Sequence, residues 1–411
     1  MQLRDFCSFV QGGRLGLTKQ DHYRSSGVPA FSAAGQDGCV DVVEFRDTDA
    51  VILSAIGANC GRCFLATGNW TTLANVQVII PRPSDAIAPF LHYRVNRDDY
   101  WPRSGSAQPF IKPSDIRSCW VALPPVPQQA AIAKVLDTLD TAIHETEAII
   151  AKLKAVKQGL LHDLLTRGID ANGELRPPQA EAPHLYKPSP LGWIPKEWQV
   201  APLSSRIASL DAGVSVNSED RPHGAGEIGV LKTSALSQGK FLPDQNKAVV
   251  ASEISLVREP VLGDSILVSR MNTPELVGES CYVSMPWPTL FLPDRIWQLK
   301  KRSPETVDMQ WLTCVFLTPY YRAYVQMHAT GTSGSMKNLP KSRLLAMPVA
   351  FPGTAEQSAI AALVDAADNR IATEASALEK LRAQKSGLMD DLLTGRVRVT
   401  PLLTTTTRGT S

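Results

Sequence analysis

One long sequence element occurs twice in this chain, and the two copies begin 228 residues apart. Residues 129–166 align without a gap to residues 357–394, and 17 of the 38 aligned positions are identical. Both copies have the apolar spacing of a helix, whereas the segments that precede them are almost unrelated. A repeat of such a long period constrains the architecture before any local motif does. We therefore expect one constant helical element that follows two different globular domains.

Apolar runs and prolines divide the rest of the sequence, and 411 residues are too many for a single core. Short apolar runs broken by Gly, Pro, Asn and Asp predict strands at 51–53, 76–80, 265–268 and 296–299, with helices near 86–93 and over 309–325. Six prolines between 167 and 200 predict a stiff, mostly irregular connector. The expected fold class is α+β. Its parts are a first mixed α/β domain (1–128), a first helix (129–168), the connector (169–200), a second mixed domain (201–352), a second helix (353–396) and a disordered tail (397–411).

A heptad count indicates what the two helices do. If Ile132 and Ile360 take position d, eight of the ten seam positions in each copy are apolar. Polar residues interrupt the seam at the same two phases in both copies, and Lys157 and Lys385 are among them. A seam this regular is typical of a coiled coil. Two unrelated surface helices, each packed on its own domain, are the alternative.

Pairing of the two helices within one chain favours an antiparallel coil that relates the halves by a pseudo-twofold axis. In that register each seam lysine faces two aspartates. The two sets are Lys157 with Asp365 and Asp368, and Lys385 with Asp137 and Asp140. A charge in a seam is costly unless it is paired, and its best-attested use is to fix the register. We therefore expect two equivalent Lys–Asp contacts, with the two domains separated by the length of the coil.

The bulk composition excludes several classes of protein. Hydrophobic residues make up 44% and charged residues 20% of the chain, as in an ordinary globular protein. No apolar run approaches the ~20 residues that span a bilayer, and no signal segment follows Met1. Seven scattered cysteines favour a reducing, cytoplasmic location over a disulfide framework. The net charge of +2 argues against a strong independent binder of polyanions, although residues 309–355 contain no acidic residue.

Motifs for catalysis or for cofactors are absent or weak. Residues 224–229 spell GxGxxG, but they precede an apolar run instead of opening a helix after a strand. Cys60 and Cys63 form a lone CxxC without a second ligand pair, so we expect no metal site. The chain has no GxxxxGK[ST] loop, no HExxH and no Asn/Asp-Pro-Pro-aromatic motif of an amino-methyltransferase. We expect no cofactor and no catalytic activity of its own.

The repeated helices and the segments around them resemble a known family, the DNA-specificity subunits of type I restriction–modification systems. Each helical copy follows prolines and begins with a glutamine, over 124–166 and 352–394. Residues 191–198 (LGWIPKEW) are similar to the family's entry into a second target-recognition domain. Residues 330–339 (TGTSGSMKNL) resemble its glycine- and hydroxyl-rich loop ahead of each helix, and residues 103–111 are a divergent form of that loop. The resemblance covers nearly the whole chain.

The resemblance implies a non-catalytic reader of double-stranded DNA. Each variable domain would recognise one half of a bipartite, asymmetric site, and the paired helices would set the spacer between the halves. The same helices would dock two adenine-N6 methyltransferase subunits, and ATP-dependent restriction subunits would join the complex. A coiled-coil scaffold or adaptor whose two domains bind proteins is the alternative. The basic window before the second helix and the hydroxyl-rich loops weigh against that alternative.

Candidate DNA contacts are side chains that donate to phosphates and base edges from loops beside strand ends. In the second domain, the loop 330–338 and the residues after the strands near 231 and 268 fit this description. In the first domain, the divergent loop 103–111 fits it. The full set is Arg103, Ser104, Ser106, Gln108, Lys112, Lys232, Arg270, Asn272, Thr332, Ser333, Lys337, Asn338 and Lys341. A solvated loop or a surface ion pair is the alternative for each.

Overall fold

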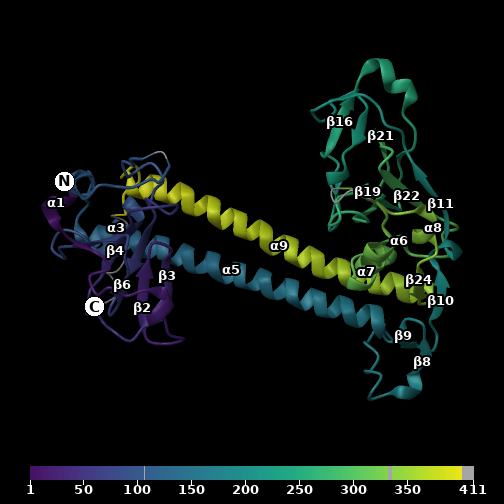
Figure 1. The fold of residues 1–411 in the computed structure, drawn as a ribbon, viewed down its shortest axis with the longest axis horizontal. Helices are drawn as coiled ribbons and strands as arrows, with labels where there is room; N and C mark the ends of the chain where they lie inside the picture. The colour runs from purple at the N-terminus through teal and green to yellow at the C-terminus, as the bar shows by residue number, and fades with distance from the viewer. Residues whose placement is uncertain (106, 332–335, 400–411) are drawn as a thin grey trace, which may run out of the picture. The chain divides into compact units, whose positions relative to one another are not determined.

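The computed structural model describes residues 1–105, 107–331 and 336–399 (Figure 1). The chain divides into two compact units, and each unit takes residues from two separate stretches of sequence. The first unit comprises Met1–Ile149 and the chain from Glu374 onward, and the second comprises Ile150–Thr373. Each unit contains an α/β part, which we call its head, and a portion of two long helices. The first head is residues 1–125, and the second head is residues 199–351.

The first head is built on an antiparallel sheet with the strand order β1-β7-β4-β5, accompanied by a smaller sheet with the order β3-β2-β6. Strand β4 is buried at every residue, as expected from its unbroken apolar run. It includes the predicted strand 51–53, and β7 includes the predicted strand 76–80. The strands are β1 (Cys7–Gln11), β2 (Val28–Ser32), β3 (Gly35–Val40), β4 (Ala50–Ser54), β5 (Cys63–Ala66), β6 (Thr71–Thr72) and β7 (Val76–Pro81).

Helix α3 connects the first sheet to the long helix of the same unit. Its Leu91 lies in the core cluster of the sheet, whereas Phe90 and Tyr93 share a second cluster with Ile132 and Leu136. The helix predicted near 86–93 therefore exists, displaced by two residues toward the C-terminus. The short helices of this head are α1 (Leu3–Phe6), α2 (Lys19–His22), α3 (Ala88–Val95) and α4 (Pro113–Ser118).

Among its described residues, the second head has two larger sheets and the two-stranded ladders β10-β24 and β19-β23. The strand orders are β11-β22-β18-β20-β15-β14 and β12-β16-β13-β21-β17, and the predicted strands 265–268 and 296–299 lie in β18 and β22. The strands are β11 (Ile207–Ala212), β12 (Ser218–Glu219), β13 (Gly229–Leu231), β14 (Leu236–Ser237), β15 (Gly239–Phe241), β16 (Asn246–Val249), β17 (Pro260–Val261), β18 (Ser265–Ser269), β19 (Met271–Asn272), β20 (Ser280–Val283), β21 (Trp287–Phe291), β22 (Ile296–Lys301), β23 (Lys337–Asn338) and β24 (Pro348–Phe351).

The single helix predicted over 309–325 is wrong, because two helices occupy this segment. Helix α6 ends at Phe316 and α7 begins at Pro319, where Thr318 caps the new helix by accepting from the Tyr321 amide. Proline has no amide to continue the ladder of α6, but it suits the first turn of a new helix. The helices are α6 (Met309–Phe316), α7 (Pro319–His328) and α8 (Lys341–Leu345), with 3-10 turns η2 (Leu203–Ser205), η3 (Thr233–Ala235) and η4 (Ala251–Leu256).

The connector 169–200 has more regular structure than its prolines predict. A 3-10 turn, η1 (Pro183–Leu185), leads into a hairpin of β8 (Tyr186–Ser189) and β9 (Gly192–Pro195). The next strand, β10 (Gln199–Pro202), pairs with β24 at the end of the second head. Both ladders have only two strands, so prolines are tolerated at their open edges. Most residues between 169 and 200 still lie outside helices and strands, as expected, and the hairpin is the part that the prolines did not predict.

The two repeated elements are the longest helices, α5 (Val126–Thr166) and α9 (Thr354–Leu393). Each begins three residues before the glutamine that opens the repeat. Beyond the end of α5, Gly168 takes a left-handed conformation with φ of 65°, as a glycine that follows a helix commonly does. None of the helices that the structure describes is long and apolar enough to cross a membrane.

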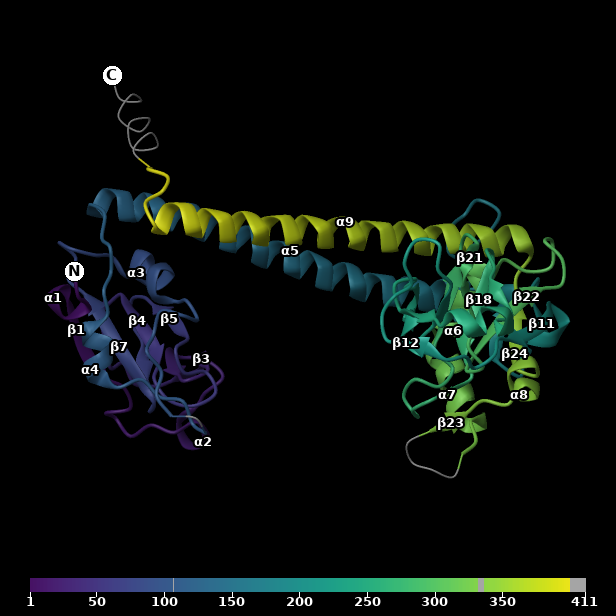
Figure 2. The same cartoon turned by 90° about the horizontal axis from the view of Figure 1, so that it is seen from above.

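Within each unit, the portions of α5 and α9 run in opposite directions (Figures 1 and 2). In the first unit Asp140 contacts Lys385, while Glu147, further along α5, contacts Arg382, which lies earlier on α9. In the second unit Lys157 contacts Asp368, and the later apolar residues of α5 share a core with earlier residues of α9. That shared set includes Leu161, Leu164, Ile360, Ala361 and Val364. Every residue at the predicted seam is buried or half-buried.

Candidate nucleic-acid interface

The main candidate site of the second head is a short β-ribbon that follows strand β18. Strand β19 pairs with β23, so that Met271 lies opposite Asn338 and Asn272 opposite Lys337. The Leu339 amide donates to the Arg270 carbonyl at 2.8 Å. We call residues 270–272 and 337–339 the second ribbon. It brings together four predicted contacts from two segments that are more than sixty residues apart in the sequence.

Two polar atoms of the second ribbon are buried and have no hydrogen-bond partner among the described residues. They are Nε of Arg270 and Oδ1 of Asn338. The Arg270 guanidinium lies 5.7 Å from the centre of the Trp297 ring, which limits where it can move. A buried polar atom without a partner costs about 1–3 kcal/mol. Guanidinium and amide groups are also the side chains that read base edges most often. The second ribbon is therefore suited to a ligand with base-like donors and acceptors.

The remaining candidates of the second head have contacts within the protein. Lys337 Nζ donates to the Gly331 carbonyl at 3.0 Å, and Lys232 lies 3.4 Å from the Asp220 carboxylate. Lys341 Nζ donates to the main-chain oxygen of Leu210 in β11 at 2.7 Å, so its charge is engaged away from the second ribbon. Asn272 donates to the Ser269 hydroxyl at 3.3 Å. Thr332 and Ser333 lie outside the described residues.

The first head repeats the main-chain bonding of the ribbon. Ser104 and Phe110 exchange two hydrogen bonds of 2.8 and 2.9 Å, as Thr330 and Asn338 do in the second head at 2.8 Å. The Ile111 amide donates to the Ala55 carbonyl at 3.0 Å, as Leu339 does to Arg270. We call residues 55–57 and 109–111 the first ribbon.

The side chains of the two ribbons are unrelated. At the positions of Arg270, Asn272, Lys337 and Asn338, the first ribbon has Ala55, Gly57, Pro109 and Phe110. None of these four first-ribbon side chains can donate a hydrogen bond. The polar candidates of the first head must therefore act from positions beside its ribbon.

Those candidates lie on and after the loop that closes the first ribbon. Arg103 packs its guanidinium against Gly61, where a Cβ atom would come within 2.6 Å of Nη2. Gln108 and Lys112 are exposed, and Lys112 directly precedes α4. Ser106 lies outside the described residues. Arg62 was missed by the sequence analysis; it is exposed at the start of β5, beside a cleft of about 510 Å³. It stands between the two cysteines of the CxxC segment.

That CxxC segment does not form a metal centre. Among residues 1–105, 107–331 and 336–399, no group of three or more His, Cys, Asp or Glu side chains could hold a metal ion. Cys60 and Cys63 are both buried, and burial raises the pKa of the Cys63 thiol to about 12. A thiol in that state stays protonated and is a poor ligand and nucleophile.

The seam lysines each contact one of the two aspartates that face them. Lys157 Nζ lies 2.6 Å from both carboxylate oxygens of Asp368, and Lys385 contacts Asp140. The two other aspartates have different partners. Asp365 accepts from the Asn369 amide at 3.2 Å, and Asp137 accepts from the Tyr93 hydroxyl at 2.7 Å.

Tyr93 adds a third member to the lysine contact of the first unit. Its hydroxyl donates to Asp140 at 2.6 Å as well as to Asp137, and its ring lies 5.4 Å from Lys385 Nζ. Burial and the two carboxylates raise the pKa of Tyr93 well above its ordinary value. The phenol therefore remains a donor at neutral pH and links α3 to α5.

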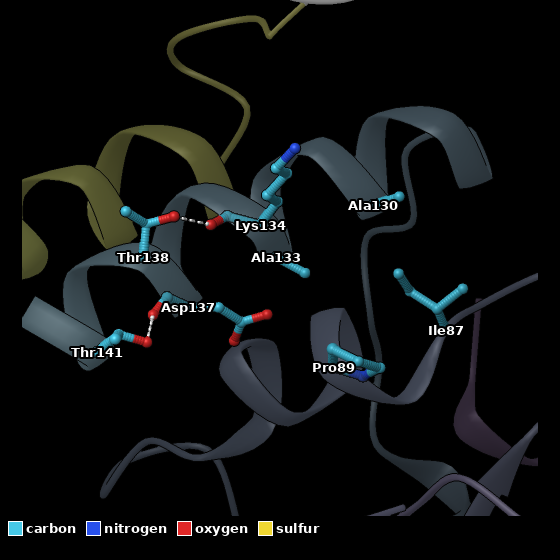
Figure 3. Close-up of a pocket in the computed structure, with 8 residues that line it drawn as sticks. All are labelled: Ile87, Pro89, Ala130, Ala133, Lys134, Asp137, Thr138 and Thr141. Atoms are coloured by element: carbon cyan, nitrogen blue, oxygen red, sulfur yellow. Dashed lines mark hydrogen bonds between the residues drawn. The ribbon is translucent and has the colours of Figure 1, made fainter.

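A shallow pocket of about 340 Å³ lies at the same junction (Figure 3). Ile87 and Pro89, at the start of α3, form one wall, and α5 forms the other. The lining residues of α5 are Ala130, Ala133, Lys134, Asp137, Thr138 and Thr141. Figure 3 shows that the two threonine hydroxyls bond back to carbonyls of their own helix, at 2.8 Å for Thr138 and 2.9 Å for Thr141. Both hydroxyl protons are therefore engaged by the helix itself.

Comparisons with known proteins all point to one family. A family model described as the type I restriction modification DNA specificity domain matches residues 1–155. The chain is 23% identical over 356 residues to the type I restriction enzyme MjaVIII specificity subunit of Methanocaldococcus jannaschii, covering 85% of this chain and 79% of that protein. It is 27% identical over 177 residues to the EcoEI specificity subunit of Escherichia coli, covering 43% of this chain and 29% of that protein.

Solved structures agree with these relatives at the level of the fold. The crystal structure of a type I restriction–modification S subunit from M. genitalium covers 95% of both chains with a TM-score of 0.60 and 16% identity. A structure described for complex assembly and conformational transition of the type I system covers 96% of both chains with a TM-score of 0.52 and 14% identity. The shared fold has mixed α+β content and long helices.

Proposed function

We propose that this chain is a specificity subunit of the type I restriction–modification family and that it recognises DNA for a multi-subunit complex, as its similarity to such subunits supports. The main support is the pair of ribbons, which have the same main-chain bonds and different side chains. Two ribbons that share a main-chain structure but differ in their side chains are suited to two different base sequences. The proposed target is therefore a bipartite, asymmetric site in double-stranded DNA.

We assign one half-site to each head, within target-recognition domains 1–128 and 201–352. In the second head, Arg270 and Asn338 are the proposed base readers, because each carries a buried polar atom to which no described residue forms a hydrogen bond. Lys337 and Lys232 have only exposed or half-buried contacts that a phosphate could replace. In the first head, Arg103, Gln108 and Lys112 are the proposed contacts, with Arg62 added from the structure.

The long helices are the proposed spacer element. Opposite helix directions and Lys–Asp pairs in both units support an antiparallel coiled coil with a pseudo-twofold internal repeat. In such a coil the number of helical turns would set the number of unread base pairs. The two lysines would hold the helices in one register, since a seam charge is tolerated only opposite its partner.

The chain is proposed to act without catalysis and to rely on partner subunits. Two adenine-N6 methyltransferase subunits would dock on the helices, and ATP-dependent restriction subunits would complete the complex. No GxxxxGK[ST] loop or amino-methyltransferase motif occurs in the sequence. A net charge of +2 also fits a reader whose partners supply part of the phosphate contacts. The scaffold alternative predicts binding of proteins without any dependence on DNA sequence.

The test is to map N6-methyladenine by single-molecule sequencing in cells that express the chain with its methyltransferase. The proposal predicts one methylated motif with two unlike half-sites and a spacer of fixed length. Mobility shift with the purified complex should then show binding that depends on that motif and weakens with salt. Loss of the motif on deleting the chain is the control. Binding of equal strength to unrelated duplexes would contradict the proposal.

A further inference from the structure

Two buried glutamines hold the heads to the long helices. Gln129 and Gln357 occupy the first turns of α5 and α9, and their exposed fractions are 0% and 1%. Buried glutamine is uncommon, because its amide has four hydrogen-bonding capacities to satisfy. The two residues align in the sequence repeat, although the heads that they contact are almost unrelated in sequence.

In the first unit, Gln129 joins three segments of main chain. Its Oε1 accepts from the Ile87 amide at 3.1 Å, and Ile87 is the N-cap of α3. Its Nε2 donates to the Asp85 carbonyl at 2.9 Å and to the Pro124 carbonyl at 2.8 Å. One side chain therefore connects the start of α5, the segment that leads into it and the start of α3.

In the second unit, Gln357 makes the corresponding contacts. Its Oε1 accepts from the Asp308 amide at 2.9 Å, and Asp308 is the N-cap of α6. Its Nε2 donates to the Pro352 carbonyl at 2.9 Å. The two glutamines thus bind the same structural element, the N-cap of the helix that follows the main sheet of each head.

Apolar packing alone would leave the orientation of a head less well defined. Phe90 and Tyr93 of α3 share a cluster with α5, and Trp311 and Leu312 of α6 share one with Ile360 of α9. Such contacts are non-directional and tolerate small rotations. A buried planar amide bonded to two or three main-chain groups tolerates them poorly, because any tilt leaves a buried polar group without a partner.

The other polar links described at these junctions are not shared by the two units. Tyr93 bonds to Asp137 and Asp140 in the first unit. Counted from the N-caps of α3 and α6, the position of Tyr93 is occupied by Cys314 in the second unit, and a thiol cannot replace a phenol that reaches two carboxylates. In the second unit Ser358 also donates to the Asp308 carboxylate at 2.7 Å, and Ala130 stands at its position in the first repeat. Among the described residues, the glutamine link is therefore the polar contact that both junctions share.

We infer that Gln129 and Gln357 are positioning residues that fix the orientation of each head on its long helix and thereby sharpen the spacing between the two half-sites. The inference rests on the proposed function. Because α5 and α9 each contribute residues to both units, a head that tilts at its glutamine would present its ribbon over a wider range of spacer lengths. The bases read within each half-site would stay the same, because the ribbons do not contact the glutamines.

The test uses Gln129→Met and Gln357→Met, which keep the length of the side chain and remove its hydrogen bonds. Gln158→Met is the matched control, since Gln158 is an exposed glutamine of α5. Each chain is assembled with the methyltransferase and offered a duplex library with fixed half-sites and spacers from two base pairs shorter to two longer. The readout is the ratio of bound duplex at the preferred spacer to bound duplex one base pair away.

We expect Gln129→Met and Gln357→Met each to lower that ratio by about tenfold. The base preferences in both half-sites should be unchanged, and Gln158→Met should leave the ratio unchanged. Gln129→Glu keeps the acceptor for Ile87 and loses the donor, so it should lower the ratio by a smaller factor. It also provides a second variant if Gln129→Met does not fold. Weaker binding at all spacers with an unchanged ratio would assign the glutamines to stability alone and overturn the inference. A wild-type complex without any sequence preference would instead overturn the proposed function.

Discussion

The first and second ribbons differ at every side chain that could read DNA and agree in their main-chain bonds. Arg270 and Asn272 stand where the first ribbon has Ala55 and Gly57. Main-chain hydrogen bonds tolerate nearly any side chain, so this support can carry unrelated readers. The attachments to the helices could not vary in the same way. Gln129 and Gln357 are buried amides, and only an amide of that length satisfies the main-chain groups around it.

The comparison therefore separates the residues proposed to read DNA from the residues that hold the heads and helices in place. Reading residues lie on the ribbons and their loops, where each head has its own set. Holding residues lie on the repeated helices, where the two units share glutamines, seam positions and lysine–aspartate pairs. Four changes, taken from the largest expected effect to the smallest, would break or sharpen this division.

Shortening both helices by one heptad should have the largest effect. Removal of residues 143–149 and 376–382 deletes Glu147 together with its partner Arg382 and preserves the heptad phase of both seams. Seven residues correspond to about 10 Å of helix, or about three base pairs of DNA. We expect the same two half-sites with a spacer shorter by that amount, measured by mapping of methylated adenines. Removal of 143–149 alone should instead destabilise the protein, and an unaltered spacer in the double deletion would refute a helical ruler.

Replacing the reading arginine of one head should affect one half-site. Arg270→Ala should reduce discrimination at one base pair of the second half-site by about 1–3 kcal/mol, because a guanidinium can bond a guanine at two points. Binding to a library randomised at both half-sites measures this. Arg103→Ala is the matched change in the first head and should act on the first half-site only. An equal loss on all sequences would make Arg270 a phosphate contact.

The two lysine pairs should differ in their contribution to stability. Asp368→Ala removes the partner of Lys157, a contact whose carboxylate is 37% exposed, and should lower the free energy of unfolding by about 1 kcal/mol. Asp140→Ala removes a partner from both Lys385 and the Tyr93 hydroxyl, and should cost about 2 kcal/mol. Urea unfolding of the full chain compares them, with Tyr93→Phe as the control. Equal losses would show that Tyr93 adds nothing to the first pair.

The smallest effect is expected at a phosphate contact. Lys337→Ala should weaken binding by a similar factor on all sequences and reduce the slope of log affinity against log salt by about one. Lys341→Ala is the control, because its ammonium is already bonded to Leu210 in β11. A titration of binding against salt concentration distinguishes the two. Loss at a single base pair would instead make Lys337 a base reader.

Local patterns predicted the frame of this protein well. The strands around 51–53 and 265–268 and the buried seam follow from the spacing of apolar residues, which acts over a few residues. The break at Pro319 was not predicted, because it depends on a proline that apolar periodicity does not register. The hairpin of β8 and β9 was missed because pairing between strands compensates for prolines at open edges.

The candidate site was predictable residue by residue but not as an arrangement. Arg270, Asn272, Lys337 and Asn338 were each identified from their residue types beside strand ends. That they lie together where β19 pairs with β23 was not predictable, since each strand is two residues long and the two are far apart in the sequence. One half of the first ribbon was visible in the sequence as part of the divergent loop 103–111. Its pairing with residues 55–57 was not, because Ala55 and Pro109 share no side-chain property with their counterparts.

By itself, the sequence determined that one helical element is used twice, that its seam is apolar and that two unlike domains precede it. Repetition and heptad period are properties of neighbouring residues, so they are visible without coordinates. Tertiary structure decided which aspartate each lysine contacts, what the buried glutamines bind and which residues share a ribbon. Those choices depend on contacts between segments far apart along the chain, where packing and main-chain hydrogen bonds select one register among several that the sequence allows.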